Sequence, residues 1–366
     1  MSDLEATPSG TTKEYDVAIL GGGLAGLTLA LQLKKARPTS RILVAEKQNH
    51  PVPEAAHKVG ESTVEIAAKY LLDLGLKEHL NTDQLRKFGL RFFFQTEDNQ
   101  DIARRVEIGL TKPTFLPSFQ LDRGRLENKL GEIVQEQGVT FLDECKVDHI
   151  DLHQEFEQDG LHQLRLHQDG QELNIQARWV VDATGRSSVL KRQLGLAKKV
   201  DHNVNAVWFR VAHRIAVDEW SDDPAWQARV VDGSRYLSTI HLCGDGYWVW
   251  LIPLASGSTS IGIVTDATIH PFDSLNNFER ALAWLHRHEP QCAAQVDRYL
   301  DDIQDFRVMK NFSYSARQVF SSSNWCLTGE AGVFLDPLYS PGSDFIAMSN
   351  TLITDLIRRS LDGEDV

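Results

Sequence analysis

The apolar positions of the first fifty residues predict a strand, a helix and a second strand in close succession. Residues 15–20 form a short, nearly continuous apolar run, which is typical of a strand buried on both faces of a parallel sheet. Residues 24–35 combine good helix formers with apolar positions at helical spacing, and Pro38 ends this pattern before a second apolar run at 41–46. This order of elements predicts a β-α-β unit.

Runs of strand length dominate the middle of the chain. Helical segments at 65–74 and 77–80 precede a strand at 89–94, and a helix that ends at 137 is followed by short strands through 178–185. Four further strands, separated by turns that contain glycine or aspartate, are expected at 206–215, 235–242, 246–254 and 258–265. We therefore expect a separate, mostly antiparallel sheet in this region. Beyond it, the pattern predicts a helix over 274–300 and a strand, a loop and a long helix over 324–361.

The composition is that of a folded protein without the charge pattern of a nucleic-acid binder. The chain has 366 residues, of which 42% are hydrophobic, so it can bury a large core spread over two or three domains. The net charge is −13 and no basic stripe is present. Nucleic acid is therefore not expected as a partner.

The cysteines and the polar N-terminus favour a cytoplasmic location. Cys145, Cys243, Cys292 and Cys326 are widely spaced and form no CxxC pair, which suits a reducing compartment and argues against structural zinc. The segment 1–13 lacks an apolar core and is expected to be flexible, and no run of about 18 apolar residues follows it. We expect neither a signal peptide nor a membrane span.

Three glycines between the first strand and the first helix have the spacing of a dinucleotide-binding loop. In GGGLAG, Gly21 permits the tight turn, Gly23 lets the backbone approach a pyrophosphate, and Gly26 allows the helix to pack closely on the strand. The helix begins with Leu24 and Ala25, whose amides are expected at the positive end of the helix dipole. Chance glycines in a turn are the alternative, but the flanking strand and helix favour a nucleotide site.

An acidic residue at the end of the second strand completes this motif. Glu46 follows Gly26 by 20 residues, where a carboxylate can accept hydrogen bonds from the ribose of an adenosine. The same charge disfavours a 2′-phosphate, so FAD or NAD is expected rather than NADP. Lys47, next to Glu46, is assigned to the same site.

Two later strand ends carry short motifs with small residues. They are WVVDATGRSS at 179–188 and CLTGEAGVFLDP at 326–337. Together they resemble the flavoprotein monooxygenase superfamily, in which an ATG strand end and a late GD…DP segment complete an FAD site. The resemblance implies that Arg123, within FQLDRGRL, lies near the ribityl and phosphate groups; a solvated arginine at a helix start is the alternative. It also implies that the late segment, with Gly329, Glu330 and Asp336, binds the flavin, and here Glu330 stands where the family usually has aspartate.

Three further motifs narrow the resemblance. They are AAHKVGES at 55–62, the WxWxIP pattern formed by Trp248, Trp250, Ile252 and Pro253, and DPLYSPGSDF at 336–345. In this order they resemble the flavin-dependent halogenases, and within that family the branch that acts on phenols and pyrroles. The resemblance runs from about residue 14 to the end of the chain.

The resemblance implies an α/β fold, in which a Rossmann-like FAD-binding domain of the glutathione-reductase type is interleaved with a mostly antiparallel β-sheet substrate domain. The FAD-binding domain is expected to be discontinuous, at 14–62, 115–200 and 310–366. The substrate domain is expected at 63–114 and 201–309. Family members usually continue into a helical region that covers the substrate site, whereas this sequence ends at Val366. A shortened C-terminal helical region is therefore expected, either because the sequence is a fragment or because it is a naturally compact member.

The resemblance also implies a reaction. In the family, reduced FAD from a separate flavin reductase and oxygen convert chloride or bromide into hypohalous acid, which reaches a lysine beside an electron-rich aromatic substrate. Lys58 of KVGES is the expected lysine, with a solvated surface charge as the alternative. The substrate is expected to be a phenol or a pyrrole, free or bound to an acyl-carrier protein, as in secondary-metabolite biosynthesis.

Two loops supply further expected site residues. Glu61 and Ser62 could reach the flavin or hold the lysine, or they could merely cap their loop. The backbone amides of Gly342 and Ser343, with Ser340 beside them, could form an anion nest for the halide near the flavin. Pro341 has no amide hydrogen and cannot donate.

Trp248 and Trp250 are expected on one face of a strand, because residues two apart share a face. Large aromatic residues often occupy such positions simply as core. Beside a flavin, two indoles would instead form a wall that keeps the aromatic substrate away and lets only a small oxidised halide pass. The pair is therefore expected to act as a barrier against hydroxylation.

Two rival functions stay open from the sequence. An aromatic hydroxylase would use the oxygen activated by the flavin directly on the substrate, and it would not depend on Lys58. A non-catalytic FAD-binding relative is the alternative from another class, which Glu330 and the short C-terminus motivate.

No other catalytic or metal motif is expected. His57, His241, His286 and His288 are scattered without the spacing of metal ligands, so structural or solvated roles are expected for them. The segment GRSSVLKRQ does not match the GxSxG motif of serine hydrolases.

Overall fold

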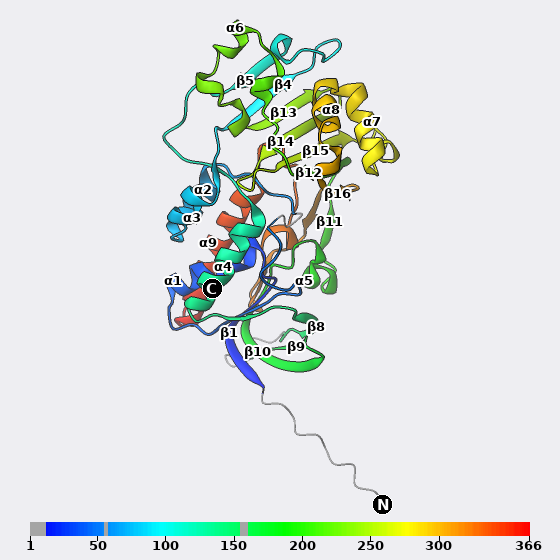
Figure 1. The fold of residues 1–366 in the computed structure, drawn as a ribbon. Coiled ribbons are helices and arrows are strands. Elements are labelled where there is room, and N and C mark those ends of the chain that lie inside the picture. Colours follow the sequence, from blue (N-terminus) through cyan, green and yellow to red (C-terminus); the bar gives the residue numbers. More distant parts are fainter. Residues whose placement is uncertain (1–11, 55–57, 154–159) are drawn as a thin grey trace, which may run out of the picture.

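The computed structural model describes residues 12–54, 58–153 and 160–366, and within these ranges the chain forms two large sheets, one above the other in Figure 1. Segments of the two sheets alternate along the sequence, which confirms the interleaved α/β fold. The predicted domain boundaries stay predictions. Most of the predicted flexible segment 1–13 lies outside the described residues, and Lys13 already belongs to the first strand. His57, with the rest of AAH in the predicted AAHKVGES motif, also lies outside them.

The eight-stranded sheet has a parallel centre. β1 (Lys13–Leu20) pairs in parallel with β2 (Ile42–Ala45) on one side and with β10 (Gln171–Asp182) on the other. The parallel pairing continues to β7 (Thr140–Leu142) and to β19 (Trp325–Leu327). Three strands are antiparallel to their neighbours: β8 (Lys146–Asp151), β9 (His162–Gln168) and β18 (Phe320–Ser321). Helix α1 (Leu24–Ala36) connects β1 to β2, which confirms the predicted β-α-β unit.

Helices cover one face of this sheet, and antiparallel strands cover the other. The helices are α1, α2 (Glu65–Asp73), α4 (Arg123–Glu136) and α9 (Gly342–Leu361), which pack on Ile19 and Val44. The adjacent strand residues Leu20 and Leu43 face the opposite way and pack with β8, β9 and α5 (Val189–Gln193). Successive strand residues point to opposite faces, so continuous apolar runs in β1 and β2 are needed to fill both cores.

The seven-stranded sheet is antiparallel except for one pair. Its strands, in spatial order, are β16 (Ile303–Met309), β12 (Val204–Val211), β15 (Thr259–Asp266), β14 (Tyr247–Pro253), β13 (Thr239–Gly244), β4 (Leu90–Phe94) and β5 (Val106–Gly109). Only β13 and β4 run in parallel. Helices α6 (Pro224–Gln227), α7 (Phe278–His288) and α8 (Pro290–Asp297) pack on one face. The prediction of a mostly antiparallel sheet is confirmed.

Short elements complete the described chain. Helix α3 (Lys77–Thr82) leads into β3 (Leu85–Arg86), which pairs with β6 (Phe119–Gln120). A second small ladder joins β11 (Ala197–Lys199) to β17 (Tyr314–Ala316).

The alternation of β14 turns its tryptophans away from the helices. Val249 and Leu251 pack with α7 and α8. Trp248, Trp250 and Ile252 belong instead to a cluster that also contains Trp208 of β12 and loop residues near 334–338. The prediction that the two tryptophans share one strand face is confirmed, and this face packs against the loop near 334–338.

Three predicted elements are wrong in their extent, and one of them, the strand predicted over 206–215, already ends at Val211. The strand predicted over 235–242 begins only at Thr239, because Arg235 is drawn into the interior, where it pairs with Glu107 and lies over the ring of Trp226. The helix predicted over 274–300 is two helices, because Pro290 lacks the amide needed to continue α7 and instead begins α8. The edge strands β5 and β16 were not predicted, since their residues are largely half-buried or exposed and the apolar alternation is weak.

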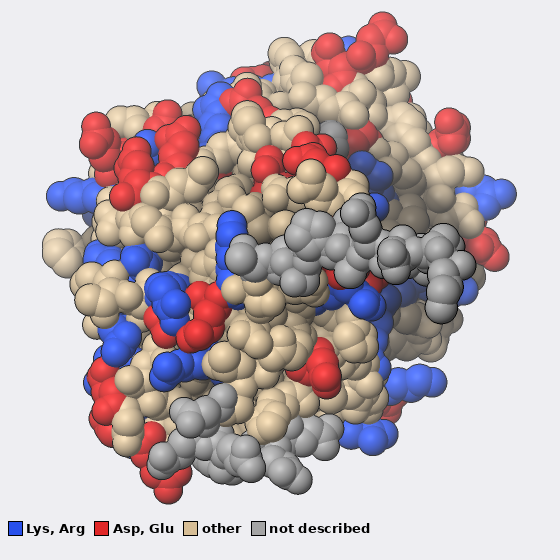
Figure 2. All heavy atoms as spheres, turned by 90° about the horizontal axis from the view of Figure 1, so that it is seen from below, with Lys and Arg blue, Asp and Glu red and all other residues tan. Residues whose placement is uncertain are grey.

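The described residues add two findings at the level of the whole molecule. None of their helices has the length and apolar character that crossing a membrane requires. They also contain no group of three or more His, Cys, Asp or Glu side chains placed to hold a metal ion. Acidic and basic side chains are interspersed over the face seen in Figure 2.

Candidate functional site

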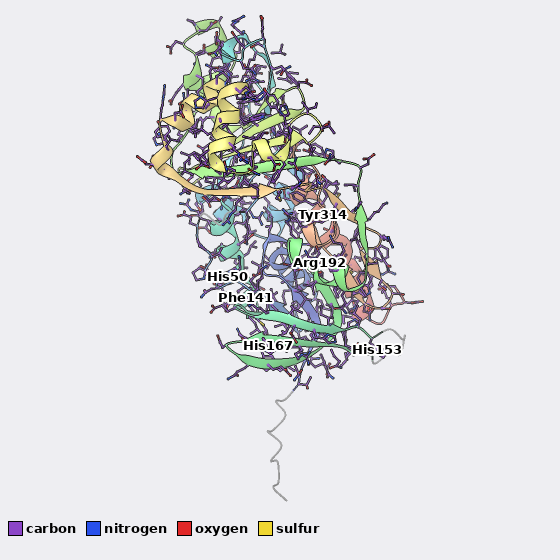
Figure 3. The ribbon with its side chains drawn as sticks, turned by 90° about the vertical axis from the view of Figure 1, so that its right-hand side faces the viewer. His50, Phe141, His153, His167, Arg192 and Tyr314 are labelled. Atoms are coloured by element: carbon purple, nitrogen blue, oxygen red, sulfur yellow. The ribbon has the colours of Figure 1, made fainter. Side chains whose placement is uncertain are left out.

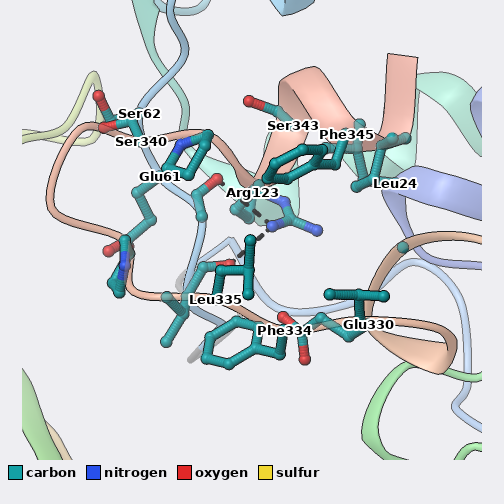
Figure 4. Close-up of a pocket in the computed structure, with 18 of the residues that line it drawn as sticks. Leu24, Glu61, Ser62, Arg123, Glu330, Phe334, Leu335, Ser340, Ser343 and Phe345 are labelled. Carbon is teal, nitrogen blue, oxygen red and sulfur yellow. Dashed lines mark hydrogen bonds between the residues drawn. The ribbon is translucent and has the colours of Figure 1, made fainter. Parts of the chain in front are cut away.

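Two adjoining cavities lie where the two sheets meet. The larger, of about 560 Å³, is lined by the glycine loop, Glu46 and the ATG turn; we call it the glycine-loop cavity. The smaller, of about 290 Å³, is lined by Trp248, Trp250 and the start of α9; we call it the tryptophan cavity (Figure 4). Five residues line both: Leu24, Val59, Arg123, Glu330 and Ile346. The two cavities therefore form one continuous site.

At Gly21 and Gly26 of the glycine loop, close contacts leave no room for a side chain. Gly21 has a φ of +109°, and a Cβ there would lie 2.4 Å from the carbonyl oxygen of Ala183. A Cβ on Gly26 would lie 2.0 Å from the carbonyl oxygen of Gly21, so only glycine lets α1 start this close to β1. Four residues of the motif line the cavity: Gly21, Gly23, Leu24 and Ala25.

Replacing Gly21 with alanine is expected to lower the free energy of unfolding by about 2 kcal/mol. Alanine is strained at the positive φ of this position, and its Cβ would also displace Ala183. Urea unfolding measures the change. Gly138→Ala is the matched control: its φ is +77° and no atom lies within 4 Å of the new Cβ, so it bears the backbone strain alone, about 1 kcal/mol. Equal losses in the two variants would contradict the steric explanation.

The Glu46 carboxylate is fixed at the end of β2. Its Oε2 accepts a hydrogen bond from the Gly22 amide at 2.6 Å, and its Oε1 accepts one from the Gln48 amide at 2.8 Å. It lines the glycine-loop cavity, as ribose recognition requires. Lys47 lines the same cavity and donates to Ser187 Oγ at 3.3 Å.

A buried cluster of charges lies where the cavities join. Arg123 Nη2 is 2.5 Å from Glu127 Oε1, and Lys58 Nζ contacts Glu127 Oε2. Burial opposes ionisation of Glu127, but the two cations outweigh it and lower the pKa of the carboxyl. Arg123 also donates to the Val59 carbonyl oxygen at 2.8 Å. The Lys58 side chain thus points into the glycine-loop cavity, and the structure does not bring it to Trp248 and Trp250.

Glu61 ties its loop to the seven-stranded sheet. Its Oε1 accepts a hydrogen bond from Arg210 Nε at 2.8 Å and forms an ion pair with Nη2 at 2.7 Å. Nη1 of Arg210 lies 2.9 Å from Asp305 Oδ2. Arg210 also donates to the Lys58 carbonyl oxygen at 2.9 Å. All three charged side chains are almost fully buried, so the network fixes the loop firmly. Glu61 lines the tryptophan cavity with a carboxylate that Arg210 already binds.

A lysine that the sequence did not single out lies next to the tryptophan cavity. Lys87 is 6% exposed, and its Nζ donates to Ser62 Oγ and to the Thr63 carbonyl oxygen, both at 2.8 Å. Burial lowers the pKa of Lys87 to about 7. Ser62 Oγ lies 2.8 Å from Thr239 Oγ1, and both residues line the cavity. Ser62 therefore holds a lysine, which is Lys87 rather than Lys58.

An aromatic row forms one wall of the tryptophan cavity. The rings of Trp248 and Trp250 are 5.7 Å apart, and the Trp248 ring is 5.4 Å from the His241 ring. His241 also stacks on Phe92 at 4.5 Å. Burial lowers the pKa of His241 to about 3, so the imidazole is neutral, and its Nδ1 has no hydrogen-bond partner among the described residues. The sequence suggested a structural histidine, and the structure places it in the cavity wall.

The loop before α9 lies across the tryptophan cavity from the loop at 334–335, with Arg123 between them (Figure 4). Ser340, Gly342 and Ser343 line the cavity. Within the part of the chain that is described, the buried hydroxyl of Ser343 has no hydrogen-bond partner. The first amides of a helix have no partner within the helix and favour an anion. These residues fit the expected halide site.

Glu330 lies where the two cavities meet, next to Gly329. Burial raises the pKa of the Glu330 carboxyl against the attraction of Arg123. The hydroxyl of Tyr314, which is labelled in Figure 3, donates to the Glu330 carbonyl oxygen at 2.8 Å. Lys191 Nζ lies 4.0 Å from the centre of the Tyr314 ring. Glu330 thus has a fixed backbone and faces the site.

Asp336 is not brought into the site. Its Oδ1 accepts a hydrogen bond from the Leu338 amide at 3.0 Å, and its Oδ2 lies 3.6 Å from His202 Nε2. Its neighbours Leu335 and Pro337 line the tryptophan cavity instead. The Asp336 carboxylate caps its own turn, and the expected cofactor contact stays a prediction.

Three site residues were missed by sequence reasoning: Lys87, Glu127 and Arg210. Glu127 follows Arg123 by one helical turn, and this spacing could have suggested the ion pair. Arg210 is the one charge in the apolar segment 204–211, a pattern that indicates a buried partner. No local pattern marks Lys87, which stands between a short strand and β4.

The site contains the features that FAD requires. The glycine loop has space only for backbone at Gly21 and Gly26, and the start of α1 offers amides. Glu46 is placed for a ribose, and the apolar tryptophan cavity adjoins the glycine-loop cavity. Among the buried side-chain atoms that have no hydrogen-bond partner in the described part of the chain, three belong to residues that line the tryptophan cavity: Ser343 Oγ, His241 Nδ1 and Arg123 Nε.

Known proteins resemble this chain over nearly its whole length. Residues 14–258 match the protein family described as FAD binding domain. The flavin-dependent halogenase chlA of Dictyostelium discoideum is 29% identical, over 95% of this chain and 61% of that protein. A 1H-pyrrole-2-carbonyl peptidyl-carrier-protein brominase of Pseudoalteromonas luteoviolacea is 25% identical, over 96% of this chain and 79% of that protein. A mutant of the halogenase PltM, solved in complex with FAD, superposes with a TM-score of 0.78 at 19% identity, over 96% of this chain and 71% of that one. The chain therefore spans 61% of the length of the first of these relatives.

Proposed function

The chain belongs to the FAD-binding domain family, and from that premise we propose that it works as a flavin-dependent halogenase. One observation carries the proposal: Lys87, a buried lysine with a pKa of about 7, donates a hydrogen bond to Ser62, which lines an aromatic cavity that adjoins the glycine-loop cavity. A hydroxylase transfers oxygen to its substrate directly and needs no such amine. Halogenation needs a group that takes up an electrophilic halogen, and a desolvated amine can do so.

Different residues of the two cavities bind FAD and the halide. FAD in its reduced form supplies, with oxygen, the oxidising equivalent that converts chloride or bromide into hypohalous acid. The residues that hold the dinucleotide are Leu24, Ala25, Glu46, Arg123 and Glu330. The amides of Gly342 and Ser343, with the free Ser343 hydroxyl, hold the halide.

Lys87 is the lysine that receives the halogen. At pH 7 the Lys87 amine is neutral in about half of the protein molecules, because its pKa lies near 7. The neutral amine attacks the halogen of hypohalous acid, which forms an N–halogen bond and releases water, or it holds the acid by a hydrogen bond. Lys58 is engaged with Glu127 and opens to the glycine-loop cavity, so we assign the role to Lys87.

The substrate is a small electron-rich aromatic ring, a phenol or a pyrrole. A cavity of about 290 Å³ with walls such as Ile252, Phe334 and Leu335 accepts a single ring. Two of the relatives are named for pyrrole-2-carbonyl groups on a peptidyl-carrier protein, which supports both pyrroles and a carrier-bound substrate. A separate flavin reductase is the proposed source of reduced FAD.

The test is a reaction of the purified protein with reduced FAD, oxygen, bromide and a panel of phenols and pyrroles, free and carrier-bound. The expected product, identified by mass spectrometry, carries bromine in place of a ring hydrogen. An oxygenated product without bromine would favour the aromatic hydroxylase. Stoichiometric FAD binding with neither product would favour a non-catalytic FAD-binding protein.

A further inference from the structure

The Glu127 carboxylate occupies the start of α1, where the glycine loop is built to receive the pyrophosphate of FAD. Its Oε1 accepts a hydrogen bond at 3.3 Å from the amide of Leu24, the first residue of α1. The same carboxylate contacts Arg123 Nη2 at 2.5 Å and Lys58 Nζ. One protein anion thus already holds a helix N-terminus, a guanidinium and an ammonium, which are the groups that bind phosphate in proteins.

Burial keeps Glu127 in this place. Its side chain is 0% exposed, and it lines the glycine-loop cavity from the middle of α4. Lys58 is the more exposed partner, with 29% of its side chain exposed. Phosphates that enter this cavity therefore meet donors that are already neutralised, and they come to lie near a carboxylate of the same charge.

We propose that Glu127 lowers the affinity of the protein for FAD by competing with the pyrophosphate for Lys58, Arg123 and the Leu24 amide. Binding of FAD moves these donors, above all Lys58, from the carboxylate to the phosphates, and release of FAD returns them. The consequence is a cofactor that exchanges readily with solution. The inference concerns FAD binding alone, so it stands even if the halogenase proposal fails.

Glu127→Gln tests the inference, because glutamine keeps the shape and one acceptor oxygen but removes the charge. The dissociation constant of oxidised FAD, titrated by quenching of flavin fluorescence, is expected to fall about tenfold, which corresponds to about 1.4 kcal/mol. Two cations are then uncompensated, so the affinity should also fall more steeply with added salt than in the unmodified protein. Glu132→Gln, at an exposed position of the same helix, is the matched control and should change neither quantity.

A double-mutant cycle distinguishes competition for FAD from a merely structural ion pair, because the two predict different effects of Lys58→Met on FAD affinity. Lys58→Met should cost more FAD affinity in the Glu127→Gln background than alone, because only there is Lys58 free for the phosphates from the start. Equal costs in the two backgrounds would argue against the competition.

An FAD affinity that is unchanged or weaker in a folded Glu127→Gln protein would overturn the inference, since Glu127 would then only position Arg123. If thermal unfolding followed by circular dichroism shows that this variant does not fold, Glu127→Asp takes its place. Aspartate keeps the charge but withdraws it from the Leu24 amide, and the dissociation constant should fall about threefold. A rise would overturn the inference in the same way.

Discussion

Replacing Lys87 with methionine is expected to lower the rate of halogenation about a hundredfold or more, while FAD stays bound. Methionine has a similar length but no amine, so the cavity wall formed by Ser62 and Thr239 keeps its shape. The variant therefore tests the nucleophile rather than the packing. Product formation at saturating reduced FAD and bromide measures the rate, and a fluorescence titration measures the binding of FAD.

The same substitution at Lys58 separates the two lysines. Lys58 pairs with Glu127 in the glycine-loop cavity, so Lys58→Met is expected to weaken FAD binding and to recover its rate at saturating FAD. Suppose instead that Lys58→Met abolishes halogenation at saturating FAD and Lys87→Met does not. The role predicted from the KVGES motif would then return to Lys58.

Lys87 also makes activity and stability depend on pH. Only the neutral amine has a free electron pair, so the rate at saturating cofactor should rise as the pH increases through about 7, the pKa of Lys87 in the folded protein. The ordinary lysine pKa is 10.5, which applies to the unfolded chain. Below pH 7 Lys87 is a buried ammonium ion in the folded protein, and its burial then lowers the free energy of unfolding by the full amount. This loss shrinks as the pH rises toward 10.5, because the unfolded state then binds more protons than the folded state.

Lys87→Met removes this loss, so it should raise the free energy of unfolding. The gain is expected to be larger at about pH 6 than at about pH 10. Urea unfolding of both proteins at the two pH values measures it. A gain that does not depend on pH would mean that Lys87 titrates at its ordinary pKa, and the argument for a neutral amine at pH 7 would be lost.

Features with local causes could be predicted from the sequence. The β-α-β unit follows from apolar runs of adjacent segments, and the glycine spacing follows from a single turn, in which Gly26 meets Gly21. The shared face of Trp248 and Trp250 follows from strand alternation alone.

Features that depend on residues far away in the sequence could not be predicted. Lys87 is held by Ser62 and Thr63, 25 and 24 residues earlier in the chain, so nothing next to it reveals its burial. Lys58 stood out because its loop carries a conspicuous motif, but Glu127, 69 residues later, captures its side chain. The position of Asp336 has a local cause instead, because a tight turn binds its carboxylate to the Leu338 amide.

Replacing Trp248 and Trp250 together with leucine is expected to divert the oxidation away from halogenation while FAD stays bound. Trp250 lies against Gly262, where a Cβ would come within 2.1 Å of the indole, and its Nε1 donates to Ser260 Oγ at 3.2 Å. Two smaller side chains leave part of this wall empty, so the tryptophan cavity widens and no longer holds the substrate ring in one position relative to the flavin. Halogenated product should fall about tenfold, and hydrogen peroxide or hydroxylated substrate should replace it.

The double variant also loses packing, at a cost of about 3 kcal/mol for each indole, so stability and wall function must be separated. Trp226→Leu is the matched control, because Trp226 is 0% exposed and packs under Arg235 in the cluster on the other face of the sheet. The Trp226→Leu protein should lose stability to a similar extent. Its yield of halogenated product, relative to hydroxylated product plus hydrogen peroxide, should not change. If the double variant shows that same unchanged ratio, the two tryptophans are ordinary core, and access to the flavin must be restricted by the loop at 334–343, which also lines the cavity.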